Sequence, residues 1–175
     1  FCEQLRAHHK TFVVFDDQSQ QSSTVAGGLY NPVVLKRFTP VWKSKEQLQL
    51  AVPMYHGLEQ EFDIKLDYKI PVLRKFSSLE EQNDWFSASD KPNLSEYLSV
   101  NLIKNTNRYI EASFGFGEVL QTGRIDVKAL MDGYKAMLLK DDRFYEAKFN
   151  YDKLEVANDE LIYGDILAKH IVFTE

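Results

Sequence analysis

The sequence predicts an α/β fold, and three observations lead to that prediction. The uncharged run of β-branched and aromatic residues at Phe12–Phe15 has the pattern of a buried strand in a parallel sheet. Residues 1–10 have the pattern of the end of an amphipathic helix, and only Thr11 separates them from that strand. Helix, tight turn and strand in this order form the second half of a βαβ crossover.

Length and composition suit one domain, or pieces of two, with a substantial core. The chain has 175 residues, of which 44% are hydrophobic, and it contains 12 Phe, 9 Tyr and 2 Trp. No apolar run approaches the roughly 18 residues of a membrane span, and the first residues lack a signal-peptide pattern. A net charge of −5 argues against general binding to nucleic acid or anionic membranes. The single cysteine, Cys2, fits a reducing compartment, so we expect a cytoplasmic protein.

The first third of the chain beyond the strand is predicted to be loop followed by a long helix. Residues 17–24 carry turn and cap side chains, and residues 30–42 are apolar but irregular, since two prolines break any long element. Residues 44–62 have an apolar stripe at helical spacing. Ser44 is the expected N-cap of this helix, and Pro53 is expected to kink or break it.

The middle of the chain is predicted to alternate between strands and helices. Residues 70–76 are expected to form an edge strand, because Pro71 cannot donate a ladder hydrogen bond. Ser78 and Glu81 have the spacing of a capping box that opens a short helix through Phe86. The further expected elements are weak helical structure at 94–103, a strand at 115–120, and a helix capped by Asp126 that runs through Leu138.

Short strands are predicted to follow this last helix. They are expected at residues 144–149, 154–156, 161–163 and 170–173. The two middle strands are expected to pair as a hairpin around Asn158 and Asp159, because these residue types tolerate the left-handed conformation of a tight turn.

Two neighbouring stretches have the composition of a nucleotide site. Asp16 ends the first strand, where dinucleotide-binding folds place a carboxylate that accepts hydrogen bonds from a ribose diol. Residues 22–28 contain hydroxyl side chains that favour phosphate and then two glycines that allow close backbone approach to a ligand. A plain strand followed by a loop with a Gly-Gly turn accounts for the same residues.

A basic cluster stands out in this acidic chain. It consists of Lys36, Arg37, Lys43 and Lys45. These side chains are compatible with a solvated approach to the helix, or with a site for an anionic substrate or a nucleic-acid backbone. The sequence contains no GxGxxG motif, no metal-ligand spacing and no nucleophile-elbow motif.

The order of these elements resembles the D-amino-acid oxidase-like family of FAD-dependent oxidoreductases, which includes glycine oxidase, sarcosine oxidase and DadA-type enzymes. The resemblance rests on Phe12–Asp17, on Ser23–Leu29 followed by a long helix, on Gly123–Asp126 and on Ala168–Glu175. The amino-acid sequence of residues 26–32 most resembles that of bacterial oxidoreductases whose substrate is unknown.

The resemblance implies a partial FAD/NAD(P)-binding Rossmann-like three-layer domain with the beginning of an inserted α+β substrate domain. Residues 1–66 and 121–175 would belong to the FAD-binding domain, and residues 67–120 to the substrate domain. The strand and GxGxxG loop that open this fold in the family are absent, so we expect an N-terminal-half fragment. Such a fragment would bind FAD weakly, and the apolar edge of strand 12–15 would be covered by the rest of the same chain or by a second copy.

The resemblance also implies the site residues and the chemistry. Asp16, or its neighbour Asp17, would hold the adenosine ribose, and Ser23 and Thr24 would lie near the pyrophosphate. The strand ending at Phe149 would offer backbone groups to the adenine. The loop expected beside the isoalloxazine ring consists of Ala26, Gly27, Gly28 and Leu29. Hydride would pass from the amine-bearing carbon of a small amine or amino acid to the flavin, and no catalytic residue is implied.

Valine at either glycine of this loop is expected to block the flavin ring and leave the fold largely intact. A turn glycine that needs positive φ would instead become unstable. Two other functions remain open: a tRNA-modifying FAD oxidoreductase that acts on a modified uridine, with the basic cluster as its footprint, and a non-catalytic binding module.

Overall fold

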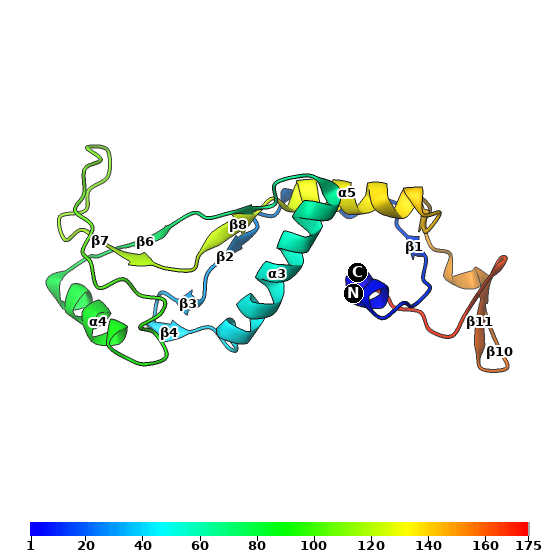
Figure 1. The fold of residues 1–175 in the computed structure, drawn as a ribbon, viewed down its shortest axis with the longest axis horizontal. Coiled ribbons are helices and arrows are strands. Elements are labelled where there is room, and N and C mark those ends of the chain that lie inside the picture. Colours follow the sequence, from blue (N-terminus) through cyan, green and yellow to red (C-terminus); the bar gives the residue numbers. More distant parts are fainter. Residues whose placement is uncertain (175) are drawn as a thin grey trace. The chain divides into compact units, whose positions relative to one another are not determined.

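The computed structural model describes residues 1–174 and has a mixed α/β fold of five α-helices and twelve short strands within that range (Figure 1). The described chain forms two compact units. Unit 1 combines residues 1–21 with the residues from 135 onward, and unit 2 comprises residues 22–134. Both boundaries of the expected three-part division lie inside unit 2, so that division stays a prediction. None of the helices within residues 1–174 is long and apolar enough to cross a membrane.

Unit 1 contains the predicted parallel strand in shortened form. β1 (Val14–Phe15) pairs in parallel with β9 (Phe144–Tyr145), with Val14 opposite Phe144 and Phe15 opposite Tyr145. Helix α1 (Cys2–Ala7) precedes β1. β1 is shorter than the expected 12–15 and β9 is shorter than the expected 144–149. Each of the two strands has only the other as a neighbour among residues 1–174, and a strand persists only where it is paired.

The rest of unit 1 is a three-stranded antiparallel meander. Its strands are β10 (Leu154–Ala157), β11 (Glu160–Tyr163) and β12 (Ile166–Ala168), preceded by a short 3₁₀ turn, η1 (Tyr151–Lys153). Asn158 and Asp159 have φ angles of 50° and 62°, which confirms the predicted hairpin turn. The predicted strand at 170–173 is wrong, because these residues have no regular structure and the third strand is β12 instead.

Unit 2 is built on three small antiparallel sheets. One has the strand order β2-β8-β5, and the other two are the pairs β3-β4 and β6-β7. The bounds are β2 (Leu29–Tyr30), β3 (Val33–Val34), β4 (Thr39–Pro40), β5 (Asp67–Tyr68), β6 (Val72–Lys75), β7 (Phe116–Val119) and β8 (Gly123–Ile125). The hairpin β3-β4 lies within residues 30–42, which the sequence predicted to be irregular. A strand of two residues is too short to produce an alternating apolar pattern that can be recognised in the sequence.

The long helices of the chain agree well with the sequence pattern, whereas the single-turn helix at residues 22–25 lies largely in a stretch that the sequence predicted to be loop. α3 (Ser44–Phe62) has the predicted bounds, and it continues through Pro53 without a break. Packing explains this continuity, since Leu58 beyond the proline is buried and Leu48 before it packs against the core. Ser44 is not the N-cap, because Lys43 occupies that position in the left-handed conformation. The other helices are α2 (Ser22–Val25), α4 (Leu79–Ser89) and α5 (Val127–Lys140).

Two of the three predicted N-caps form, at Ser78 and Asp126. The Ser78 hydroxyl accepts a hydrogen bond from the Glu81 backbone N–H at 3.1 Å, and Asp126 Oδ1 accepts one from the Ala129 N–H at 3.1 Å. In a capping box the Glu81 carboxylate would accept from the N–H of Ser78. Here it accepts from the N–H of the preceding residue, Ser77, at 2.7 Å.

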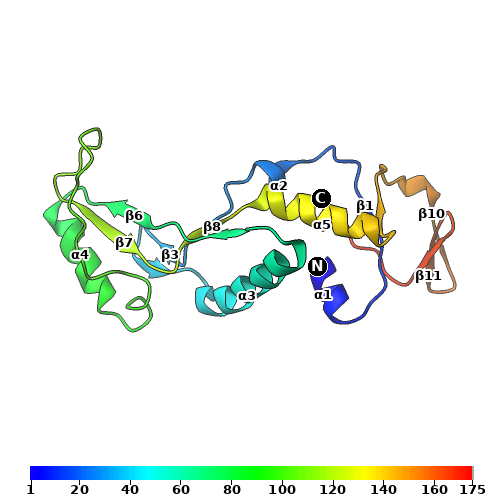
Figure 2. The same ribbon diagram turned by 45° about the horizontal axis from the view of Figure 1, so that its top comes forward.

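The main core of unit 2 is centred on Trp85. This side chain is fully buried, contacts the ring of Phe76 edge-on at 5.6 Å and donates its Nε1–H to the Ser99 carbonyl at 2.9 Å. Helix α4 lies alongside β6 and β7 (Figure 1, Figure 2). Trp85 of this helix packs closely against β7, since a Cβ on Gly117 would lie 2.4 Å from its ring. The helical structure expected at 94–103 is wrong. Turns come first, and then single bridges pair Leu98 and Ile103 with residues of β7.

Candidate functional site

The predicted ribose carboxylates lie directly after β1 in unit 1. The Asp16 N–H donates to the Tyr145 carbonyl at 3.1 Å, so this residue still continues the parallel ladder. Asp16 Oδ1 accepts from the Gln18 N–H at 2.8 Å, and Asp17 Oδ1 accepts from the Ser19 N–H at 2.9 Å. Each carboxylate therefore makes the same local turn, but Asp16 is half-buried and Asp17 is exposed. The hydrogen bonds of Ser19, side chain first and backbone second, lower the pKa of Asp17.

An aromatic cluster surrounds the end of the same strand. Phe15 stacks on Tyr145 at 4.9 Å and contacts Tyr163 edge-on at 5.2 Å, while Phe149 stacks on Tyr163 at 4.4 Å. Phe149, predicted near the adenine, thus lies in the same cluster as the residue that precedes Asp16. Aromatic surface of this kind is chemically suited to a heterocyclic base. No sequence period marks this cluster, because its members come from three separate strands and from the loop after β9.

The predicted phosphate and flavin residues belong to unit 2. Ser23 and Thr24 lie inside the single-turn helix α2, and the Ser23 carbonyl accepts from the Ala26 N–H at 3.3 Å. Beyond this turn the backbone enters β2 through the two glycines. Val25 and Leu29 are 83% and 66% exposed, so apolar side chains on both sides of the glycines are in contact with solvent.

The two glycines have different structural roles. A Cβ on Gly27 would meet nothing within 4 Å. Gly28 has φ +66°, and a Cβ there would lie 2.0 Å from the backbone oxygen of Ile125. The Gly28 carbonyl also accepts from the Ile125 N–H at 3.0 Å. The expectation that both glycines accept valine without disturbing the fold is therefore wrong for Gly28, since its position is dictated by close contact with β8.

The sheet that follows the glycine loop carries a polar cluster that the sequence did not reveal. The Tyr30 hydroxyl donates to Asp67 Oδ1 at 2.8 Å, and Lys69 Nζ donates to the Tyr30 hydroxyl and to Asp67 Oδ2 at 2.6 Å each. Burial raises the pKa of Tyr30. Burial opposes the ammonium of Lys69, but its bonds to Asp67 and Tyr30 outweigh that effect and raise the pKa. Gly123 leaves the space above β8 that the Tyr30 hydroxyl fills.

The neighbouring positions of the same sheet carry a second group of side chains. Leu29, Arg124 and Tyr68 are in register across β2, β8 and β5. The Arg124 guanidinium lies 5.5 Å from the Tyr68 ring centroid and 3.3 Å from Asp126 Oδ2. The side chain of Arg124 is 40% exposed, and Tyr68 is also 40% exposed. A cation stacked on an aromatic ring is therefore open to solvent beside the glycine loop.

Glu59 is an ionised carboxylate with a structural role at the end of α3. Its Oε1 accepts from the N–H groups of Leu66 and Asp67 at 2.7 and 2.8 Å, and its Oε2 contacts His56 Nδ1 at 2.8 Å. The backbone N–H of Asp67 is the largest cause that lowers the pKa of Glu59, to about 2. This carboxylate fixes the start of β5 and so positions the Tyr30–Asp67–Lys69 cluster.

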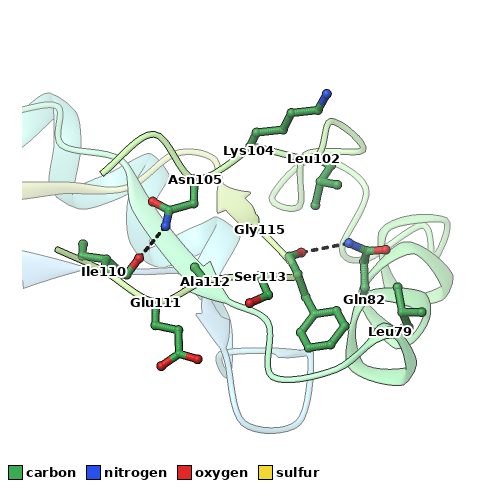
Figure 3. Close-up of a pocket in the computed structure, with 11 residues that line it drawn as sticks. Leu79, Gln82, Leu102, Lys104, Asn105, Ile110, Glu111, Ala112, Ser113 and Gly115 are labelled. Atoms are coloured by element: carbon green, nitrogen blue, oxygen red, sulfur yellow. Dashed lines mark hydrogen bonds between the residues drawn. The ribbon is translucent and has the colours of Figure 1, made fainter. Parts of the chain in front are cut away.

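An open groove of about 620 Å³ lies at the other end of unit 2. Figure 3 shows Leu79 and Gln82 on one side of it and the loop of residues 104–113 on the other. The Gln82 amide donates to the Phe114 carbonyl at 2.9 Å, and the Asn105 amide donates to the Ile110 carbonyl, so the two amide side chains of the groove are already bonded. The groove contains none of the predicted site residues.

No group of three or more His, Cys, Asp or Glu side chains suited to a metal ion occurs within residues 1–174. Comparisons of the chain with protein-family models and with solved structures found no match.

Proposed function

We propose that the protein is an FAD-dependent oxidoreductase that acts on a small amine or amino acid. In this proposal unit 1 is part of a Rossmann-like three-layer domain that binds the adenosine end of FAD. Unit 2 supplies the loop beside the flavin ring and the sheet of the substrate domain. FAD would accept hydride from the amine-bearing carbon of the substrate, and the chain would bind and orient the two reactants.

The observation that carries the proposal is the parallel pair β1-β9 with Asp16 at its carboxyl end. In open α/β folds, ligands bind beyond the carboxyl ends of parallel strands. Asp16 Oδ1 accepts one backbone N–H, and no other hydrogen bond to this carboxylate is found among residues 1–174. A carboxylate has about four acceptor positions, so Asp16 retains the capacity to accept the two hydroxyls of a ribose.

The residues of unit 2 also fit the flavin group. A planar ring requires a flat approach to backbone, and Gly27 offers it because nothing lies within 4 Å of its Cβ position. Leu29 and Arg124 extend this open surface along the sheet. In the proposal Leu29 packs against the flavin or the substrate, and Arg124 attracts an anionic group such as a substrate carboxylate.

The test compares two aspartates that make the same turn. The protein is expressed from its complete reading frame, and bound FAD is measured by flavin absorbance and by titration of the apoprotein. Asp16→Ala should weaken FAD binding by roughly 10- to 150-fold, because a hydrogen-bonded charged acceptor contributes about 1.5–3 kcal/mol. Asp17→Ala is the matched control and should leave FAD affinity within about twofold.

Three results would contradict parts of this proposal. A wild-type protein without flavin absorbance and without affinity for added FAD contradicts the function itself. Equal FAD affinity in Asp16→Ala and wild type removes Asp16 from the site. A loss confined to Asp17→Ala transfers the ribose role to that residue.

A further inference from the structure

We propose that unit 2 has a second binding surface, independent of FAD, for single-stranded nucleic acid. We name it the Trp42 surface and define it by Lys36, Arg37, Trp42 and Lys43. The four side chains are exposed, and they lie on the hairpin β3-β4 and the segment that joins it to α3.

The hairpin holds its cations outward because its apolar side chains are anchored in the core. Val33 is 2% exposed, and the Phe38 ring packs edge-on against the buried Trp85 at 5.5 Å. Lys36 and Arg37 lie in the turn between the two strands, where the Arg37 N–H donates to the Val34 carbonyl at 3.1 Å. The turn is therefore ordered, and its two charges point away from the core.

The packing of unit 2 leaves most of the Trp42 side chain exposed to solvent. The residue is 75% exposed, whereas Trp85, the other tryptophan of the chain, is fully buried. Lys43 Nζ lies 5.0 Å from the Trp42 ring centroid, and the Trp42 carbonyl accepts from the Gln47 side chain at 2.8 Å. The backbone at Trp42 is thus held by α3, while most of the indole surface remains available to a flat ligand.

The segment that leads up to α3 is basic, and the first acidic residue after it is Glu46 in the first turn of the helix. Residues 29–45 contain four Lys and Arg and no Asp or Glu, in a chain of net charge −5. Lys45 is neutralised by Glu96 at 3.0 Å and is excluded from the surface for that reason. Within residues 1–174 no ion pair engages Lys36, Arg37 or Lys43. Lys43 lies beside the exposed ring, and Lys36 and Arg37 lie in the turn of the hairpin that precedes it.

An exposed aromatic ring with one unpaired cation beside it and two more on the preceding hairpin turn matches the chemistry of single-stranded nucleic acid. Bases stack on aromatic side chains without regard to sequence, and Lys and Arg neutralise the phosphates. A duplex keeps its bases stacked inside, so it can use the cations but not Trp42. An acidic peptide or an anionic bilayer could also use the cations, and both are included as outcomes of the test.

The experiment measures binding of the protein, expressed from its complete reading frame, to a labelled single-stranded RNA of about 12 nucleotides. Fluorescence anisotropy gives the affinity between about 50 and 200 mM salt. Tryptophan fluorescence gives a second readout, because a base that stacks on Trp42 quenches an exposed indole and leaves the buried Trp85 unaffected.

Each variant has a defined expected result. Trp42→Ala should weaken binding by about 5- to 150-fold, the range of one base–aromatic stack, and abolish the quenching. The double variant Lys36→Ala/Arg37→Ala should reduce the slope of log K against log salt by roughly 1.4, since single strands contribute about 0.7 for each phosphate contact. Lys75→Ala/Lys91→Ala removes the same charge from two other exposed positions of unit 2 and should change neither quantity.

The proposal is overturned by any of three results. These are no binding at 50 mM salt, equal binding of duplex and single strand without quenching, or stronger binding to anionic vesicles or polyglutamate than to RNA. All three can be read whether or not the protein carries FAD.

Discussion

Two adjacent glycines, Gly27 and Gly28, allow the fold and the proposed flavin contact to be tested separately. We predict that Gly28→Val unfolds unit 2 at markedly lower denaturant, while Gly27→Val leaves its stability unchanged and removes FAD. The two substitutions add the same side chain one residue apart. Any difference between them therefore comes from what surrounds each Cβ position.

The magnitude for Gly28 follows from its geometry. A side chain at φ +66° costs about 1–2 kcal/mol. The added Cβ would lie 2.0 Å from the Ile125 carbonyl oxygen, which is backbone of the central strand β8 and cannot rotate away. Moving apart would break the 3.0 Å hydrogen bond from the Ile125 N–H to the Gly28 carbonyl, at a further cost of about 1 kcal/mol. The expected loss is at least about 2 kcal/mol for Gly28→Val, against less than about 0.5 kcal/mol for Gly27→Val.

Urea unfolding followed by the fluorescence of Trp85 measures both values, because this side chain is fully buried in unit 2. Flavin absorbance of the same preparations measures the ligand effect. Wild-type stability in Gly28→Val would refute the packing argument. A Gly27→Val protein that retains FAD and activity would show that the loop does not lie beside the flavin.

Two other substitutions test how unit 2 is held together. Glu59→Gln should cost roughly 1.5–3 kcal/mol in the free energy of unfolding at pH 7, since the Glu59 carboxylate accepts two backbone N–H groups. The pKa of Glu59 is lowered from 4.5 to about 2, so its contribution to stability is complete above pH 4.5 and is lost as the pH falls towards 2. The free energy of unfolding in urea should therefore change less between pH 7 and pH 3 in Glu59→Gln than in the wild type. Gly117→Ala should cost about 1–3 kcal/mol in urea unfolding, because its Cβ would lie 2.4 Å from the Trp85 ring, and an unchanged midpoint would mean that the core can expand at this point.

The long helices could be predicted from the sequence because their pattern is local. The apolar stripe of α3 repeats over five turns, and it gave both ends of the helix correctly despite Pro53. Asp126 and Ser78 gave the starts of α5 and α4 for the same reason, since an N-cap and the N–H it accepts from lie within three residues. The cap at Lys43 could not be predicted in this way, because a left-handed N-cap without a side-chain bond has no residue signature.

The small sheets and the polar cluster could not be predicted because they depend on pairing between distant segments. Tyr30 and Asp67 are 37 residues apart and meet only because both strands pair with β8. The Trp42 surface was predicted only as a basic cluster. Charge is visible in composition, but the 75% exposure of Trp42 is a property of the folded chain. Asp16 and Asp17 follow a strand, as predicted, and which of them binds a ribose stays a prediction; the difference in their burial is not visible in the sequence.

Only some of the glycines around the sheet β2-β8-β5 can support a prediction of a ligand site, because the others are required by the fold. Gly28 is explained by the Ile125 carbonyl, and Gly123 is explained by the Tyr30 hydroxyl, which would lie 2.4 Å from an added Cβ. Both are therefore required by the fold whether or not a flavin binds. Gly27 has no such neighbour, and a glycine without one costs backbone entropy and returns no contact within the chain. Of the glycines near the proposed flavin contact, Gly27 is the one whose missing side chain the packing of unit 2 leaves unexplained. The proposal for this loop consequently depends on that residue.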